Sequence, residues 1–263
     1  MRSRRPGGGA GALLALGATL ARRGPLAVVS VAVSAVTALA LCLLAFAFAR
    51  RGGDAPVQSV PILASSAIAW GGGFLQAVAV AAGALRRDRA EGLRYLLVTR
   101  TTSVNGYVLA RLGGLAAVLA VVVGGGTLVV SAAALVGATR LRVVGVTLHS
   151  TVAAALYALA FAAVIAPVAF AALGARGRAS GYLYLLLVLV APEILADALT
   201  GPLPSEVTEL CAIPSALAAL RSSIAGPLDP LRLLRALVAI AIFAGVGAFL
   251  VRRDVLVAES EDV

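Results

Sequence analysis

The chain has 263 residues, of which 61% are hydrophobic and 13% charged, and its mean hydropathy is +1.01. Soluble domains carry about 25% charged residues, so this chain has more apolar surface than one water-soluble core buries, and lipid must solvate much of it. The net charge of +10 comes from arginine clusters between long uncharged stretches, as in membrane proteins with basic cytoplasmic loops. Aromatic residues for base stacking are sparse in these clusters, which argues against a nucleic-acid partner.

The start of the chain predicts a basic tail followed by a helix that lies in the membrane interface. Leu13, Leu16 and Leu20 have helical spacing and share one face. Arg22 and Arg23 follow them, and arginines in this position reach the lipid headgroups. A signal peptide is the alternative, but the apolar run after Arg23 is too long for a signal core.

Six stretches with few or no charges follow, and one helical crossing needs about 20 such residues. The predicted spans are residues 26–49, 61–85, 107–137, 150–174, 180–199 and 232–251. The fifth is the weakest, because Glu193 and Asp197 interrupt it. Before the last, Asp229 and Pro230 form a suitable N-cap and first-turn pair. We expect the arginines that follow this pair, Arg232 and Arg235, to extend outward toward water.

The distribution of arginines predicts the orientation. Placing both termini in the cytoplasm puts about twice as many arginines inside as outside, although Arg50 and Arg51 fall outside. We therefore expect an all-α, polytopic protein of the inner (plasma) membrane, with six transmembrane helices, an N-terminal interfacial helix and both termini cytoplasmic. The whole chain, 1–263, then forms a single transmembrane domain. Outside the spans it comprises the tail and interfacial helix (1–25), a cytoplasmic segment (86–106) and a long external segment (200–230).

All 22 basic residues are arginine. A Walker-type phosphate loop needs a lysine on the β- and γ-phosphates, so this chain cannot be a standard P-loop ATPase. If ATP drives its work, another polypeptide binds the nucleotide. Cys42 lies in a predicted span, Cys211 lies in a loop, and His149 has no cysteine or histidine nearby. The sequence therefore predicts no disulfide framework and no metal site.

The segment between the second and third spans is dense in charge and also carries an apolar ridge. The ridge consists of Leu93, Leu96 and Leu97. Arg87 and Glu91 are four residues apart, a favourable pairing along a helix, and Thr102 or Ser103 is placed to cap the next helix. This pattern predicts a short amphipathic cytoplasmic helix between two spans. The alternative is a solvated basic loop.

This segment resembles the one that joins spans two and three in the permeases of type-2 ABC exporters. There an acidic, basic and glycine-containing stretch precedes a leucine-rich turn, a polar break and a helix that re-enters the membrane. The matching positions here are Asp88, Arg89, Glu91 and Gly92, then Leu96 and Leu97, then Thr101 to Ser103, then Tyr107 onward. The glutamate usual in the leucine-rich turn is replaced by Arg94 or Tyr95. The layout of the family matches nearly the whole chain, and its partly re-entrant external segment corresponds to residues 200–230.

The resemblance implies a transmembrane permease subunit of an ATP-driven exporter that moves a substrate across the inner membrane. Such a chain has no ATPase site and no cofactor of its own, because ATP and Mg bind to a separate ABC ATPase subunit. It dimerises with itself or pairs with a second permease. The residues implied in coupling to the ATPase are Arg87, Asp88, Arg89, Glu91, Gly92, Leu93, Leu96 and Leu97.

Polar residues within the spans are the other candidates. Those predicted for a translocation path are Ser66, Trp70, Gln76 and Thr127. Such side chains equally often pin two membrane helices together, and both interpretations stay open. Glu193 and Asp197 lie four apart on one helix face near the outer side, where paired carboxylates guide a cation or relay a proton. The alternative is an ordinary span end in water, paired with Arg221.

Two further classes of function stay open. An ion-coupled transporter is expected to show internal repeats with broken helices, and the sequence has no convincing repeat. A membrane-embedded enzyme needs a nucleophile with a base, or a carboxylate–metal cluster, and neither accompanies His149. The spans carry no fixed charge that would select a cargo, so the sequence does not indicate a substrate.

Overall fold

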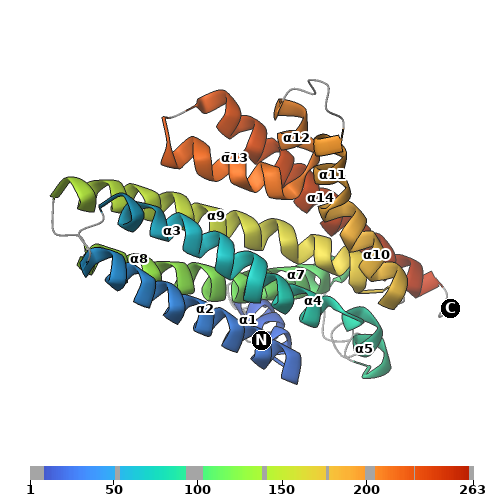
Figure 1. Ribbon diagram of the computed structural model, residues 1–263. Helices are drawn as coiled ribbons and strands as arrows, with labels where there is room; N and C mark the ends of the chain where they lie inside the picture. Colours follow the sequence, from blue (N-terminus) through green and yellow to red (C-terminus); the bar gives the residue numbers. More distant parts are fainter. Residues whose placement is uncertain are drawn as a thin grey trace, which may run out of the picture.

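In the computed structural model, the described residues are 9–50, 54–92, 103–137, 141–175, 178–198, 205–227 and 229–260. Every regular element in these ranges is a helix, and they contain no strand (Figure 1). The prediction of an all-α fold is therefore confirmed.

Among the described residues, five helical stretches are long and apolar enough to cross a membrane: Pro25–Arg50, Ser59–Ala90, Val104–Gly137, Val143–Leu173 and Pro230–Val257. The shortest has 26 residues, about 39 Å at 1.5 Å per residue, which exceeds the hydrocarbon core of about 30 Å. They correspond to the first, second, third, fourth and sixth predicted spans. Five such helices indicate a membrane-embedded protein.

The second and third of these stretches each contain a π-helical turn at or beside a triple-glycine sequence. The second consists of most of α3 (Asp54–Ile68), then η1 (Ala69–Gly73), α4 (Phe74–Ala81) and, after a turn, α5 (Ala84–Ala90). The third consists of α7 (Val104–Leu119), η2 (Ala120–Gly124) and α8 (Gly125–Gly137). The two π-turns contact each other. A Cβ atom on Gly73 would lie 2.7 Å from Val123 Cγ2, and one on Gly72 would lie 2.6 Å from the Ser30 carbonyl oxygen. These glycines thus allow close helix approach.

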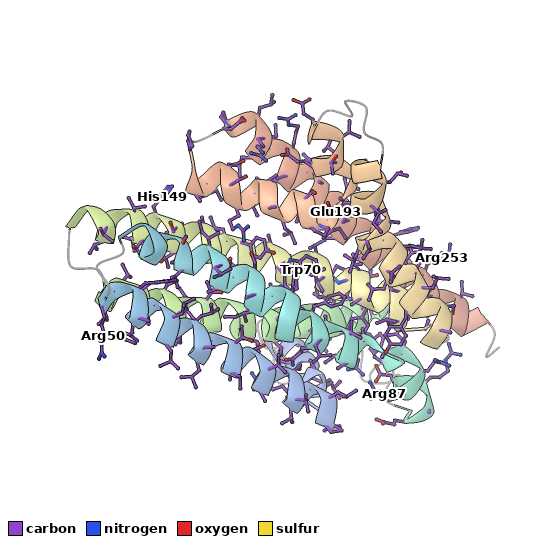
Figure 2. All side chains as sticks on the ribbon, viewed as in Figure 1. Arg50, Trp70, Arg87, His149, Glu193 and Arg253 are labelled. Carbon is purple, nitrogen blue, oxygen red and sulfur yellow. The ribbon has the colours of Figure 1, made fainter. Side chains whose placement is uncertain are left out.

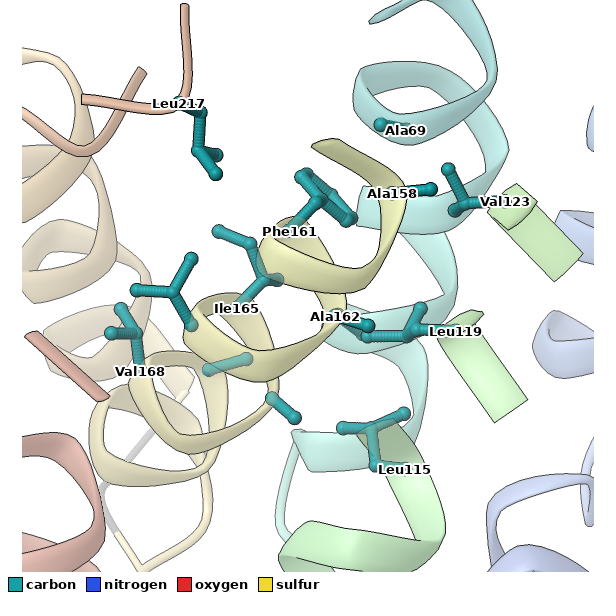
Figure 3. Packing of buried hydrophobic residues seen from close by; sticks show 14 of the residues in the cluster. Ala69, Leu115, Leu119, Val123, Ala158, Phe161, Ala162, Ile165, Val168 and Leu217 are labelled. Carbon is teal, nitrogen blue, oxygen red and sulfur yellow. The ribbon is translucent and has the colours of Figure 1, made fainter. Parts of the chain in front are cut away.

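Helix α9 (Leu141–Leu173) is the centre of the bundle. In its apolar stretch 78% of the residues are buried, compared with 22% for α2 (Pro25–Arg50). Figure 3 shows Phe161 and Ile165 of α9 in the buried cluster, which also includes Leu115, Leu119, Val123 and Leu217. The exposed side of α2 carries large aliphatic side chains, as expected for a helix whose outer face contacts lipid.

The predicted fifth span, 180–199, is divided into α10 (Arg178–Leu189) and α11 (Ala191–Ala198), and neither alone has the length of a crossing. Helical hydrogen bonds nevertheless continue across the junction, from Val190 N to Leu186 O and from Ile194 N to Val190 O. Pro192 explains the break, because it has no N–H to donate to residue 188. Two shorter helices follow, α12 (Ser205–Cys211) and α13 (Ile213–Ala225).

Helix termini match the predictions in some places and extend past them in others. The Ser103 hydroxyl caps α7 by accepting a hydrogen bond from Gly106 N at 3.2 Å. Asp229 accepts bonds from the backbone N–H groups of residues 231 and 232 at the start of α14 (Pro230–Ser260), both at 3.1 Å. Both predicted N-caps are confirmed. The fourth span starts nine residues early and therefore includes His149 within the helix, and the last continues beyond residue 251.

The N-terminal helix α1 (Gly9–Ala21) packs along α7. The predicted leucine face is half-buried at Leu13, Leu16 and Leu20. Gly17 lies against Ala110 and Gly114: a Cβ on Gly17 would lie 1.9 Å from the Ala110 carbonyl oxygen and 3.1 Å from Gly114 Cα. No side chain fits there, so the crossing depends on glycine.

Candidate functional site: a helix anchored to the third span

The charged segment after the second span begins with a turn bonded to the central helix. Gly83 has φ = 67°, the left-handed conformation that favours glycine, and its N–H donates to Leu173 O at 3.0 Å. Helix α5 (Ala84–Ala90) follows, and Gly92, at φ = 64°, comes just after its end in the position typical of a C-terminal glycine. This local structure makes α5 a separate short helix.

A buried ion pair connects α5 to α7. Asp88 is 2% exposed and Arg111 is 7% exposed. Arg111 Nε donates to Asp88 Oδ2 at 2.6 Å, and Arg111 Nη2 donates to Oδ1. The Tyr107 hydroxyl also donates to Asp88 Oδ2. The carboxylate therefore receives a two-pronged guanidinium contact, the strongest geometry for such a pair, plus a third hydrogen bond.

This anchor changes the interpretation of one predicted coupling residue. Asp88 points inward and is too buried for a partner protein to contact, whereas Arg87, Arg89 and Glu91 are exposed. Arg87 Nη2 also approaches the carbonyl oxygens of residues 80 and 82, at 3.5 and 3.4 Å, where α4 ends. The predicted ridge of Leu93, Leu96 and Leu97 lies outside the described residues.

A surface hollow of about 430 Å³ lies beside the α4–α5 turn. It is lined by Ala82, Gly83, Arg86, Arg87 and Ala90. Its walls combine small residues with two arginines, so it presents a basic concavity next to the anchored helix.

Two of the predicted path residues belong to a polar cluster that joins three helices. Trp70 Nε1 donates to the Tyr157 hydroxyl at 2.8 Å. The Arg221 guanidinium of α13 lies over the Tyr157 ring, 5.1 Å from its centroid, and donates to the Ile62 carbonyl oxygen at 3.2 Å and to Ser66 Oγ. Helix α13 is thus bound to α3 and α9 through Arg221.

Replacing Arg221 with glutamine is expected to lower the free energy of unfolding by about 2 kcal/mol, because a cation–π contact and charge-assisted hydrogen bonds are lost. Hydrogen exchange should accelerate in α13 and stay unchanged in α1. Thermal unfolding in detergent and peptide-resolved exchange measure both effects. Arg253→Gln, at an exposed position, is the control, and protection of α13 equal to that of the unmodified protein would contradict the role of Arg221.

The other two path residues lie elsewhere. Gln76 is 0% exposed, and its Oε1 accepts a hydrogen bond from Ser30 Oγ at 3.2 Å, which joins α4 to α2. Gln76 Nε2 and Thr127 Oγ1 are buried without a partner among the described residues. The structure therefore does not bring the four predicted path residues together. The hydrogen bond between Gln76 and Ser30 joins two helices, as in the second of the two interpretations left open by the sequence.

Glu193 supports the start of α13. Ser215 donates to its carboxylate from both the backbone N (2.9 Å) and Oγ (2.7 Å). The N-cap residue of α13, Ala212, has no accepting side chain, so Glu193 supplies from α11 the partner that the first N–H groups of a helix need. If Glu193 and Asp197 were an ordinary span end, their expected partner was Arg221, but Arg221 contacts Ser66. The side chain of Asp197 lies outside the described residues.

The arginines at the start of α14 pair with acidic residues of α12. Arg232 Nε donates to Glu209 Oε1 at 2.7 Å, and Arg235 Nη1 lies 2.8 Å from Glu206 Oε1. Both acidic residues belong to α12, so these two ion pairs connect α12 to α14. The α12–α13 segment is therefore held by three sets of contacts: Glu193 of α11, the two arginines of α14, and the polar contacts that Arg221 makes with α3 and α9.

Three of these residues were not among the sequence candidates: Arg111, Tyr157 and Ser215. The buried ion pair could have been anticipated from Arg111, because a charged residue just inside an apolar helix requires a partner. Within the described ranges, no group of three or more His, Cys, Asp or Glu residues is placed to hold a metal ion. Comparison with protein-family models and with curated proteins finds no match.

Proposed function

We propose that this chain is the transmembrane permease subunit of an ATP-driven ABC exporter and works with a separate ABC ATPase subunit. The observation that carries the proposal is the anchored helix α5. It forms the end of the second apolar stretch, Ser59–Ala90, and is joined to α7 through the buried Asp88, while Arg89 and Glu91 are exposed. A force applied to the exposed face of α5 would therefore be transmitted directly to a span.

The proposed architecture has six crossings and two cytoplasmic termini. Helices α10 and α11 together cover 178–198 and would extend over about 31 Å, enough to serve as the fifth crossing. The α12–α13 segment would be the partly re-entrant external region, and α1 the interfacial helix. Figure 2 shows Arg87 and Arg253 at one end of the bundle and Arg50 and His149 at the other, so the α5 segment and the end of α14 would lie on the same, cytoplasmic side.

In this proposal the residues of the coupling segment have two roles: some contact the ATPase, and one transmits its movement to the span. The exposed side chains of α5, the basic hollow beside it and the leucine ridge would receive the ATPase. Asp88 would transmit the movement and would not touch the partner. ATP and Mg would bind to the ATPase subunit, a second permease or a second copy would complete the transmembrane part, and the inner membrane would be the location.

Co-purification with an ABC ATPase encoded next to this chain tests the proposal. A complex is expected, and reversing both exposed charges (Arg89→Glu with Glu91→Arg) should weaken it about tenfold, because complementary charges become like charges. Arg253→Glu changes an exposed charge elsewhere and is the control. Failure to form any complex, or equal affinity for the double variant and the unmodified chain, would contradict the docking role.

A further inference from the structure

A small basic cavity lies where α1, α5 and α7 meet. Its volume is about 80 Å³, and its charged lining consists of Arg23, Arg87, Asp88, Glu91 and Arg111. One water needs about 10–15 Å³ of such space, so the cavity has room for several waters or one phosphate group. We propose that it binds the phosphate-bearing headgroup of an anionic phospholipid.

The balance of charge in the cavity favours an anion. Asp88 and Arg111 neutralise each other in the buried pair. Arg23 and Arg87 then face a single remaining carboxylate, that of Glu91. In the described part of the chain, Arg23 forms no ion pair and no side-chain hydrogen bond, and the contacts of Arg87 at α4 are with backbone carbonyls. Positive charge is therefore left for a ligand to neutralise.

The position of the cavity favours a lipid as the source of that anion. Arg23 follows the end of α1 at Ala21, and Arg87 follows the end of α4 at Ala81, so the cavity lies where the apolar helices give way to charge. Apolar side chains of Leu20 and Val80 form its other wall. A headgroup bound by the arginines would leave its acyl chains beside apolar surface, as in basic lipid sites between membrane helices. This inference requires only that the chain is membrane-embedded and is independent of the proposed function.

Thermal unfolding in uncharged detergent tests the inference by titration with short-chain phosphatidylglycerol, phosphatidylcholine or inorganic phosphate. We expect phosphatidylglycerol alone to raise the unfolding midpoint saturably. Arg23→Gln should weaken its apparent affinity about fivefold, and Arg23→Gln with Arg87→Gln about 25-fold. Arg23→Lys should retain most of the affinity because it keeps the charge. Arg252→Gln, an exposed arginine on α14, is the matched control and should titrate like the unmodified protein.

Three results would overturn the lipid assignment. Equal stabilisation by phosphatidylcholine would mean that anionic charge is not recognised. Equal stabilisation by inorganic phosphate would assign the cavity to a free anion. An unchanged titration in the double variant would place any lipid site elsewhere on the protein.

Discussion

Replacing Arg111 with leucine is expected to lower the free energy of unfolding by about 3–5 kcal/mol. The loss arises because Asp88, which is 2% exposed, would keep only the Tyr107 hydrogen bond among the described residues and would lose its counter-charge. Asp88→Leu should cost a similar amount, because it leaves the guanidinium unpaired. Denaturant unfolding of the purified protein in detergent measures both.

The double variant separates the ion pair from general damage to the helix interface. Asp88→Leu with Arg111→Leu removes both charges, and replacing a whole buried pair with apolar residues is often nearly neutral. It should therefore be more stable than either single variant. Arg89→Leu, on the exposed side of the same helix, should change stability by less than about 0.5 kcal/mol. Additive losses in the double variant would show that Asp88 and Arg111 are not coupled.

Replacing Gly17 with alanine is expected to separate α1 from α7 and to lower the free energy of unfolding by about 2–3 kcal/mol, the upper part of the range for overpacked contacts. The added Cβ would lie 1.9 Å from the Ala110 carbonyl oxygen and 3.1 Å from Gly114 Cα. These are backbone atoms, so no rotamer change relieves the clash. Amide hydrogen exchange should become faster throughout α1, and thermal unfolding should occur at lower temperature.

Gly11→Ala makes the same substitution on the same helix, where a Cβ would meet nothing within 4 Å. Alanine is favoured over glycine in a helix by about 0.5–1 kcal/mol, so this control should be neutral or slightly stabilising. Equal responses of the two variants would contradict the assignment of the Gly17–Gly114 crossing as the contact that holds α1.

Features determined by local chemistry were predictable from the sequence. Long apolar runs define α2 and α14 because a crossing needs a fixed number of apolar residues, and Ser103 and Asp229 cap the helices that follow them because their oxygens accept from nearby N–H groups. Asp88 and Glu91 resemble each other in the sequence, yet one is buried and the other exposed. Their difference depends on where Arg111, 23 residues away, is placed by the packing of α7.

Features determined by contacts between distant segments were not predictable. Arg221 lies 155 residues from Ser66, and nothing in either local sequence indicates that they meet. The division of the fifth span at Pro192 is different, because it follows from a local feature, the missing N–H of proline. Glu193 was predicted as a possible external carboxylate, but its role as a cap depends on Ser215 and on the lack of an accepting side chain at Ala212.

The proposed function is tested most directly by ATP hydrolysis of the partner ATPase, measured in nanodiscs with and without this chain. The account predicts that the chain changes the hydrolysis rate. It also predicts that Asp88→Asn removes this effect while the complex still forms, because that residue transmits movement without contacting the partner. A hydrolysis rate that is the same with and without the chain, or ATP-independent transport by this chain alone, would contradict it.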